Sequence, residues 1–121
     1  MAKLRRTDEQ LPLSPPVLYI LLALADEDRH GYAIMQEVEG RTSGTVRLLP
    51  GSLYSTIKRM LAQDLIKERP QPAGVESDDE RRRYYGITPF GRQIAAAEVD
   101  RLSTLVNFAR DKKITASETA G

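Results

Sequence analysis

The residues with the clearest potential for chemistry lie in the stretch DDERRRYYGITPFG, residues 78–91. Its first eight positions hold three acids, three arginines and two tyrosines. Such a run of charges usually marks a solvated surface. Guanidinium groups also bind phosphate through parallel hydrogen bonds, and successive side chains of a β-strand alternate between its faces. We therefore expect a hairpin whose tyrosines pack against the protein while three arginines reach toward a polyanion: Arg81, Arg82 and Arg83.

A second candidate surface lies on a helix that is expected to begin near Pro50. Apolar residues recur at positions i, i+4, i+7 and i+8, which predicts a buried stripe of Leu53, Ile57, Met60 and Leu61. The opposite side carries hydroxyls, an aromatic ring and two cations but no carboxylate: Ser52, Tyr54, Ser55, Lys58 and Arg59. A solvated polar face is the competing interpretation. Carboxylates are unfavourable on a surface facing DNA, which carries one negative charge per roughly 1.7 Å.

The residue types on this face suggest different roles. Arg59 could donate two parallel hydrogen bonds to guanine and so read the sequence. Ser52, Tyr54 and Lys58 are better suited to phosphate contacts, which fix the position of a protein on the duplex. The predicted DNA-binding set therefore combines this helix face with the arginines of the hairpin.

Composition excludes several kinds of site. The chain has no cysteine, which rules out disulfides, thiolate zinc sites and a cysteine nucleophile. Its only histidine is His30, so one chain cannot form a histidine-rich metal site or a histidine dyad. There is no phosphate-cradling glycine loop, no HExxH motif and no spacing typical of a catalytic triad, and the acids at 76–80 lack the EF-hand pattern. We therefore expect that the protein is not an enzyme and that it has no cofactor and no metal site. We expect a structural role for His30.

Charge is distributed unevenly along the chain, although the net charge is only +1. Residues 26–39 hold five acids and one arginine, whereas residues 47–92 hold nine basic and six acidic residues. The near-neutral total does not indicate a nucleic-acid partner, but the separation of acidic and basic parts favours a binding surface in the second. The longest apolar run, 17–25, is shorter than the about 20 residues that span a membrane. We expect a cytoplasmic protein with no membrane partner.

Periodicity and capping signals predict the order of the elements. We expect a helix from Ser14 and Pro15, a helix over 31–44 and an extended segment at 45–49. Pro50 and Gly51 are expected to break the chain before a third helix that Ser52 caps. Strands at 65–69 and 81–87 around a polar loop follow, and then a helix from Thr88 and Pro89 to about Lys113. The expected fold class is mainly α with a small β-hairpin. Three helices followed by a hairpin form a winged helix-turn-helix, whose third helix enters the major groove of DNA.

The last helix is longer than a small domain requires. Its apolar stripe continues for about five turns, more than a three-helix core is expected to cover, although the helix could also pack only on its own domain. We predict a homodimer in which this stripe forms the contact, through Val99, Leu102, Leu105, Val106 and Ala109. The predicted parts are a flexible arm at 1–13, a winged helix-turn-helix DNA-binding domain at 14–87, a C-terminal dimerisation helix at 88–113 and a disordered tail at 114–121.

Three segments together resemble the PadR family of bacterial transcriptional regulators: HGYAIMQEVE at 30–39, PGSLYSTIKRMLAQDLI at 50–66 and DDERRRYYGITPFGR at 78–92. The resemblance implies a homodimeric winged-helix DNA-binding protein, usually a repressor and often relieved by a small ligand. The short C-terminal part resembles the compact subgroup with a single dimerisation helix. Some compact members hold flat drugs between tryptophans of that helix, but this chain has no tryptophan. Acids at 78–80 also stand beside the expected wing and could weaken its attraction to phosphate.

The sequence therefore predicts a ligand-responsive repressor that binds a palindromic operator as a homodimer. Tyr19, Tyr32 and Met35 could line a cavity for a small-molecule effector, and the resemblance adds Phe108 and Leu105 near the dimer centre. One alternative is a protein-interaction module that uses the winged-helix scaffold without DNA. Another is a small-molecule sensor in which DNA binding is secondary.

Overall fold

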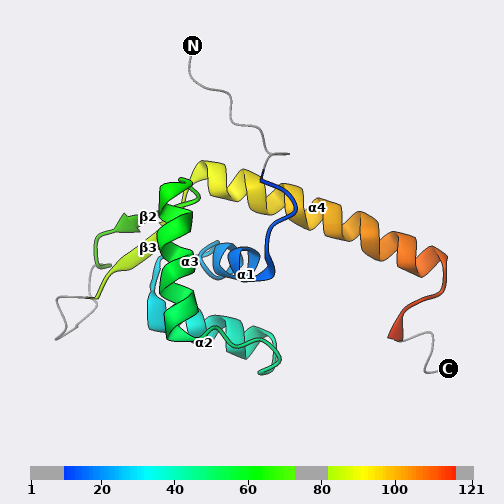
Figure 1. The fold of residues 1–121 in the computed structure, drawn as a ribbon, viewed down its shortest axis with the longest axis horizontal. Helices are drawn as coiled ribbons and strands as arrows, with labels where there is room; N and C mark the ends of the chain where they lie inside the picture. Colours follow the sequence, from blue (N-terminus) through cyan, green and yellow to red (C-terminus); the bar gives the residue numbers. More distant parts are fainter. Residues whose placement is uncertain (1–9, 73–81, 117–121) are drawn as a thin grey trace, which may run out of the picture.

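The computed structural model of the protein describes residues 10–72 and 82–116. Within these residues the elements follow the order α1 (Pro15–Ala23), β1 (Arg29–His30), α2 (Gly31–Arg41), α3 (Pro50–Ala62), β2 (Ile66–Arg69), β3 (Tyr84–Ile87) and α4 (Pro89–Asp111). Figure 1 shows the first three helices gathered in one body, with the sheet at its edge and α4 running along the body and past it. The fold is mainly α with a small antiparallel sheet, which confirms the predicted fold class.

The start of α4 follows the prediction. The hydroxyl of Thr88 accepts a hydrogen bond from the backbone N–H of Gly91 at 2.9 Å, and Pro89 opens the helix. Proline is favoured there because its fixed φ suits a helix and its missing N–H would have had no partner within the helix. The helix ends at Asp111, slightly before the predicted end near Lys113.

The start of α3 differs from the prediction, because Leu49 and not Ser52 occupies the N-cap position. Pro50 takes the first helical position, for which proline is well suited. Ser52 therefore lies inside the first turn, where its hydroxyl donates to the carbonyl of Leu49 at 3.2 Å. α2 likewise ends at Arg41, before the predicted stop at Gly44, which adopts a positive φ in the turn that follows.

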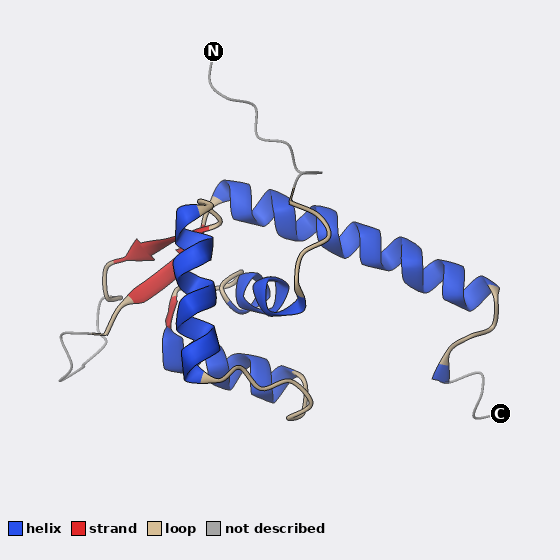
Figure 2. Cartoon of the chain, in the orientation of Figure 1, coloured by secondary structure: helices blue, strands red, loops and turns tan. Residues whose placement is uncertain are grey.

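The sheet has three antiparallel strands in the order β1-β3-β2 (Figure 2). The two-residue strand β1 is too short to show a period in the sequence, so only the β2–β3 hairpin was predicted. β3 begins at Tyr84, which leaves Arg82 and Arg83 just before it. Tyr84 and Tyr85 are both buried, Tyr85 in the core and Tyr84 against the ring of His30. The tyrosines therefore fix the base of the hairpin to the body, as predicted.

Apolar side chains from all four helices and the sheet meet in one core. Its most deeply buried members are Ile20, Leu21, Leu24, Ile34, Leu53, Ile57, Met60, Leu65, Ile66 and Ile94. In α3 the buried stripe is made by Leu53, Thr56, Ile57 and Met60, whereas the predicted Leu61 is only half-buried. α3 thus turns one side to the core and leaves the other side exposed.

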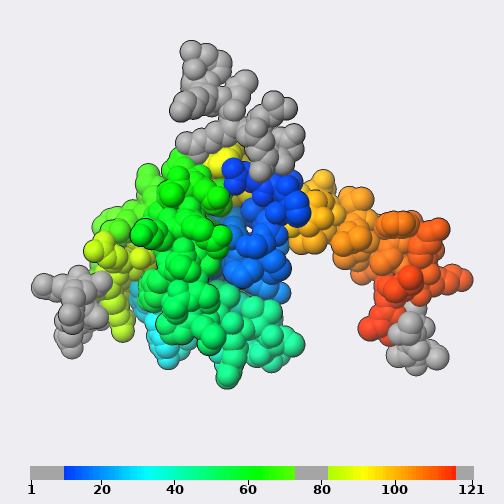
Figure 3. Space-filling view, in the orientation of Figure 1, coloured from blue at the N-terminus to red at the C-terminus, as the bar shows by residue number. Residues whose placement is uncertain are grey.

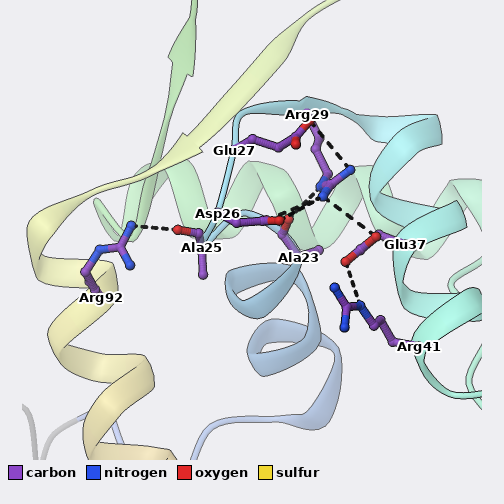
Figure 4. A network of polar contacts seen from close by, with 8 residues as sticks. All are labelled: Ala23, Ala25, Asp26, Glu27, Arg29, Glu37, Arg41 and Arg92. Atoms are coloured by element: carbon purple, nitrogen blue, oxygen red, sulfur yellow. Dashed lines mark hydrogen bonds and ion pairs between the residues drawn. The ribbon is translucent and has the colours of Figure 1, made fainter.

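The acidic residues at 26–39 are explained by arginines that face them. The Arg29 guanidinium is mostly buried, with 16% of its side chain exposed. It donates to the carbonyl of Ala23 at 2.8 Å and pairs with Asp26, Glu27 and Glu37 (Figure 4). Glu37 also pairs with Arg41 at 3.0 Å. These contacts join the end of α1 to α2, and the acids serve the fold.

The residues before α1 also contact α4. Leu11 and Leu13, which lie within the predicted arm, are half-buried against the core. The carboxylate of Glu98 is buried beneath them, with 2% of the residue exposed, and it accepts hydrogen bonds from the backbone of Leu13 and from Arg101 at 2.7 and 2.8 Å. Hydrogen bonds from Arg101 lower the pKa of Glu98 below its ordinary value. Glu98 therefore stays ionised and connects α4 to the chain before α1.

Replacing Glu98 by glutamine is expected to destabilise the protein by about 1.5–3 kcal/mol at pH 7, because it removes charge-assisted hydrogen bonds from a buried position. The pKa of Glu98 is lowered by folding, so its ionised form stabilises the protein above its ordinary pKa, and this stabilisation disappears as the pH falls through the lowered value. The difference between wild type and variant should therefore shrink toward zero in acid. Denaturant unfolding at several pH values measures it.

A suitable control for this pH dependence is Glu39→Gln. Glu39 makes an exposed ion pair with Arg47 at 3.6 Å, and such pairs contribute about 0–1 kcal/mol. A Glu98→Gln variant whose loss of stability persisted unchanged in acid would show that the carboxylate charge is not what stabilises this contact.

Candidate nucleic-acid interface

The exposed side of α3 carries the predicted contact residues. Leu53, Ile57 and Met60 face the core, so the helix turns its other side to solvent. All five predicted residues of the helix are exposed: Ser52, Tyr54, Ser55, Lys58 and Arg59. No acid occurs within α3, so this face presents hydroxyls and cations only. A surface of this kind suits a polyanion.

These five residues span the face from one flank to the other. At 3.6 residues per turn, Tyr54 and Arg59 lie about 140° apart around the helix axis. The Arg59 guanidinium donates to the hydroxyl of Thr56 at 3.4 Å, and the Ser55 hydroxyl donates to the carbonyl of Ser52 at 3.1 Å. Arg59 and Ser52 therefore occupy one flank, Tyr54 occupies the other, and Ser55 and Lys58 lie between them.

A cleft lies beside Tyr54, between α3, the start of α2 and the residues that lead into β3. Its volume is about 510 Å³. Seven residues line this cleft, called the Tyr54 cleft below: His30, Gly31, Tyr32, Tyr54, Arg82, Arg83 and Tyr85. The structure thus brings Arg82 and Arg83 next to the α3 face, on its Tyr54 flank. Arg81 and the acids at 76–80 lie outside the described residues.

The cations of this surface differ in whether a carboxylate neutralises them. Arg83 pairs with Glu68 on β2 at 3.0 Å, and Arg69 pairs with Asp28 at 3.4 Å. Among the described residues, no carboxylate forms an ion pair with Lys58, Arg59 or Arg82. Their charge is therefore available to an external anion, whereas most of the other arginines serve ion pairs within the fold.

His30 has the structural role that was predicted for it. Its Nδ1 accepts a hydrogen bond from the backbone N–H of Ala33 at 3.2 Å, which caps α2. Its ring packs edge-on against Tyr84 with centroids 5.3 Å apart. Burial, together with the neighbouring Arg82, lowers the pKa of His30 below its ordinary value, so the ring is neutral at pH 7. The proximity of His30 to Arg82 could not be predicted from any local pattern, because 52 residues separate them.

The predicted dimerisation residues lie on the part of α4 that extends past the body. Ile94, Ala95 and Glu98 in the first half are buried against the rest of the protein. Along the same side of the second half, apolar side chains are exposed: Val99, Leu105, Val106 and Phe108, with Leu102 and Ala109 half-buried. Figure 3 shows this half of α4 projecting from the body. Nothing in the described chain covers this apolar stripe.

The predicted effector residues do not share one cavity. Tyr19 lines a groove of about 500 Å³ between α1 and α2, together with Leu22 and Val38. Tyr32 and Met35 instead line an open groove between α2 and the segment before α3. Phe108 lies on the projecting half of α4, with 59% of it exposed. Tyr19 therefore lines a different groove from Tyr32 and Met35 in this protomer.

Two features, a metal site and a membrane-spanning helix, are absent from the part of the chain that the structure describes. No group of three or more histidine, cysteine, aspartate or glutamate side chains there is placed to hold a metal ion. None of the described helices is both long and apolar enough to cross a membrane.

Several known proteins resemble this chain. The sequence model of the transcriptional regulator PadR-like family matches residues 20–97. The chain is 36% identical over 104 residues to the transcriptional regulator Rv3488 of Mycobacterium tuberculosis, which covers 86% of this chain and 88% of that protein. It is 33% identical over 73 residues to an uncharacterized protein of Lysinibacillus sphaericus, which covers 60% of this chain and 64% of that protein.

The fold is also found in solved structures. A crystal structure of a PadR family transcription regulator from Clostridium difficile R20291 matches with a TM-score of 0.67 and 23% identity, over 81% of this chain and 97% of that chain. A transcriptional regulator from Clostridium thermocellum matches with a TM-score of 0.66 and 24% identity, over 83% and 90% of the two chains. Because the family model covers more than half of the chain, from α1 into α4, the chain belongs to the PadR-like family of transcriptional regulators.

Proposed function

We propose that the protein is a sequence-specific DNA-binding repressor that acts as a homodimer on a palindromic operator. The observation that carries the proposal is the acid-free exposed face of α3, whose cations Lys58 and Arg59 are not neutralised by any described carboxylate. Arg82, next to β3, extends this basic surface on one flank. An operator with this protein bound would be inaccessible to the transcription machinery. The proposed site of action is the cytoplasm.

In the proposed complex α3 lies in the major groove, where base pairs present distinct patterns of donors and acceptors. Arg59 reads guanine, while Ser52, Tyr54 and Lys58 hold phosphates on the flanking strands. The wing, which includes Arg81 outside the described residues, contacts the backbone or the adjacent minor groove. A dimer of two-fold symmetry places its α3 helices on half-sites about 34–36 Å apart.

A small-molecule effector would fit the groove between α1 and α2, which the predicted residue Tyr19 lines. That groove is largely apolar, with Tyr19 and Leu22 in its lining and Asp26 and Glu37 at its polar side. A ligand can strengthen or weaken DNA binding only if it binds one arrangement of the dimer more tightly than another. We propose that a largely apolar ligand would bind there and change the spacing of the two α3 helices.

Selection of bound sequences from random duplex pools tests this function. A palindromic consensus with half-sites one helical turn apart would support it. The affinity should also fall with rising salt, with a slope of about −0.9 for each phosphate contact. A protein-interaction module would enrich no sequence and show no such slope, and either result would end the proposal.

Replacing Arg59 by alanine is expected to lower the preference for the operator over random duplex by about 5- to 150-fold, because a guanine contact through two hydrogen bonds provides about 1–3 kcal/mol of discrimination. Competition binding with the two duplexes measures this preference. Lys58→Ala is the matched control: loss of a phosphate contact should weaken binding to both duplexes equally. An unchanged preference in the Arg59→Ala protein would mean that Arg59 does not read a base.

A further inference from the structure

Two side-chain hydrogen-bond donors lie close together in the Tyr54 cleft, one on His30 and one on Arg82. A neutral imidazole carries one N–H, and its other nitrogen is an acceptor. Nδ1 of His30 accepts from the N–H of Ala33, so it holds the lone pair. The proton therefore lies on Nε2, which points into the cleft as a donor. This assignment follows from the helix cap and does not depend on any ligand.

Arg82 places a second donor against the first. Its Nη1 atom lies 3.4 Å from Nε2 of His30. A guanidinium group has five N–H donors and no acceptor, so these two nitrogens cannot form a hydrogen bond with each other in this tautomer. Within residues 10–72 and 82–116, neither nitrogen donates to an acceptor. An anion with several acceptor oxygens would satisfy both.

The rest of the cleft is consistent with an anion. Glu68 neutralises Arg83 at 3.0 Å, but no described carboxylate pairs with Arg82, so the described lining of the cleft carries a net positive charge. Gly31 has no side chain, and the Tyr54 hydroxyl lies where a Cβ on Gly31 would be. The glycine thus lets a third donor, the Tyr54 hydroxyl, approach the start of α2. Tyr54 belongs to the exposed face of α3, so the cleft borders the proposed DNA surface.

We propose that the Tyr54 cleft binds one phosphate group of the DNA backbone, held by the Arg82 guanidinium and the Nε2–H of His30, with the Tyr54 hydroxyl as a further donor. This inference rests on the proposed function. It makes His30 a residue with two roles: one ring nitrogen caps α2 and the other contacts the ligand. Because a phosphate carries no sequence information, the site would position the protein on the duplex and would not select bases.

The variant His30→Asn separates the two roles. Asparagine is among the best N-cap residues, so the cap on α2 is kept, but its side chain has no counterpart of Nε2. Loss of the ring contact with Tyr84 should lower thermal stability only slightly, while affinity for operator and for random duplex should fall by the same factor, about tenfold. Wild-type affinity in a folded His30→Asn protein would overturn the site.

The variant Arg82→Gln tests the charge. It should make the slope of log affinity against log salt less steep by about 0.9, the value for one phosphate contact. Arg41→Gln is the control of equal charge change, since Arg41 is exposed at the far end of α2 and pairs with Glu37. An Arg82→Gln protein with the wild-type slope would also overturn the site.

Nuclear magnetic resonance of the imidazole separates failure of this site from failure of the proposed function, and assignment is simple because His30 is the only histidine. The free protein should show the proton on Nε2, and added duplex should shift that signal. A proton on Nδ1, or no shift with either duplex or inorganic phosphate, would reject the site. A shift with inorganic phosphate, in a protein that binds no duplex, would reject the proposed function and show an anion site for a free phosphate compound.

Discussion

Replacing Gly91 by alanine is expected to destabilise the protein by about 2–3 kcal/mol, the cost of forcing an extra methyl group into a packed core. Gly91 is buried in the first turn of α4, and a Cβ there would collide with the backbone carbonyl oxygen of Leu65. That oxygen cannot easily retreat, because the N–H of Thr88 donates to it at 3.1 Å and the Thr88 hydroxyl donates to the carbonyl of the preceding residue, Asp64, at 2.7 Å. Denaturant unfolding of the variant measures the loss.

The expected sign is opposite to the usual effect in a helix, where alanine is more favourable than glycine by roughly 0.5–1 kcal/mol. Gly40→Ala in α2 is the matched control, because no atom outside its own helix backbone lies within 4 Å of a Cβ built there. That variant should gain stability by about this amount. If Gly91→Ala were as stable as Gly40→Ala, the close approach of α4 to Leu65 would not exist in solution.

The contrast between the two glycines shows which parts of the fold could be predicted from the sequence. Thr88 and Pro89 mark the start of α4 by local chemistry alone, and the structure confirms it. The reason for Gly91 lies in Leu65, which is distant in sequence, and no local pattern reports such a contact. The strand β1 was missed for the same reason: two residues form it only because β3 lies beside them.

One part of the candidate site could be predicted from the sequence, and another part could not. The exposed face of α3 could be read from helical periodicity, because the positions of Leu53, Ile57 and Met60 determine which side is left to solvent. The wrong cap at Ser52 came from giving the hydroxyl more weight than the proline two residues before it. The contact between His30 and Arg82 depends on how the sheet meets α2, so it appears only in three dimensions.

The distribution of charge along the sequence was the least reliable guide to the binding surface. The acids at 26–39 suggested a surface of opposite sign to the DNA-binding part, but the structure shows that arginines of the same fold pair with them. Arg29 alone pairs with Asp26, Glu27 and Glu37. The functional signal is therefore the presence of cations without partners, and a count of charges along the sequence cannot distinguish these from paired ones.

Replacing both Leu105 and Phe108 by glutamate is expected to convert the proposed dimer to monomers and to weaken operator binding by about 10²–10⁴-fold, the gain typical of two linked binding events. Leu105 and Phe108 are 53% and 59% exposed in the protomer, so the substitutions should change protomer stability little. In the dimer, each glutamate would bring an unpaired carboxylate into an apolar contact, which is strongly unfavourable. Sedimentation and operator binding measure the two effects.

The matched control is the double variant Ser103→Glu and Asn107→Glu, which adds the same charge to the opposite side of the same part of α4. Both residues are exposed, and neither belongs to the apolar stripe. This protein should remain a dimer, with operator affinity reduced only by the long-range repulsion between added carboxylates and DNA, an effect that salt screens. Two equally impaired double variants would assign the loss to charge. A Leu105→Glu, Phe108→Glu protein that still sedimented as a dimer would place the dimer contact elsewhere on the protein.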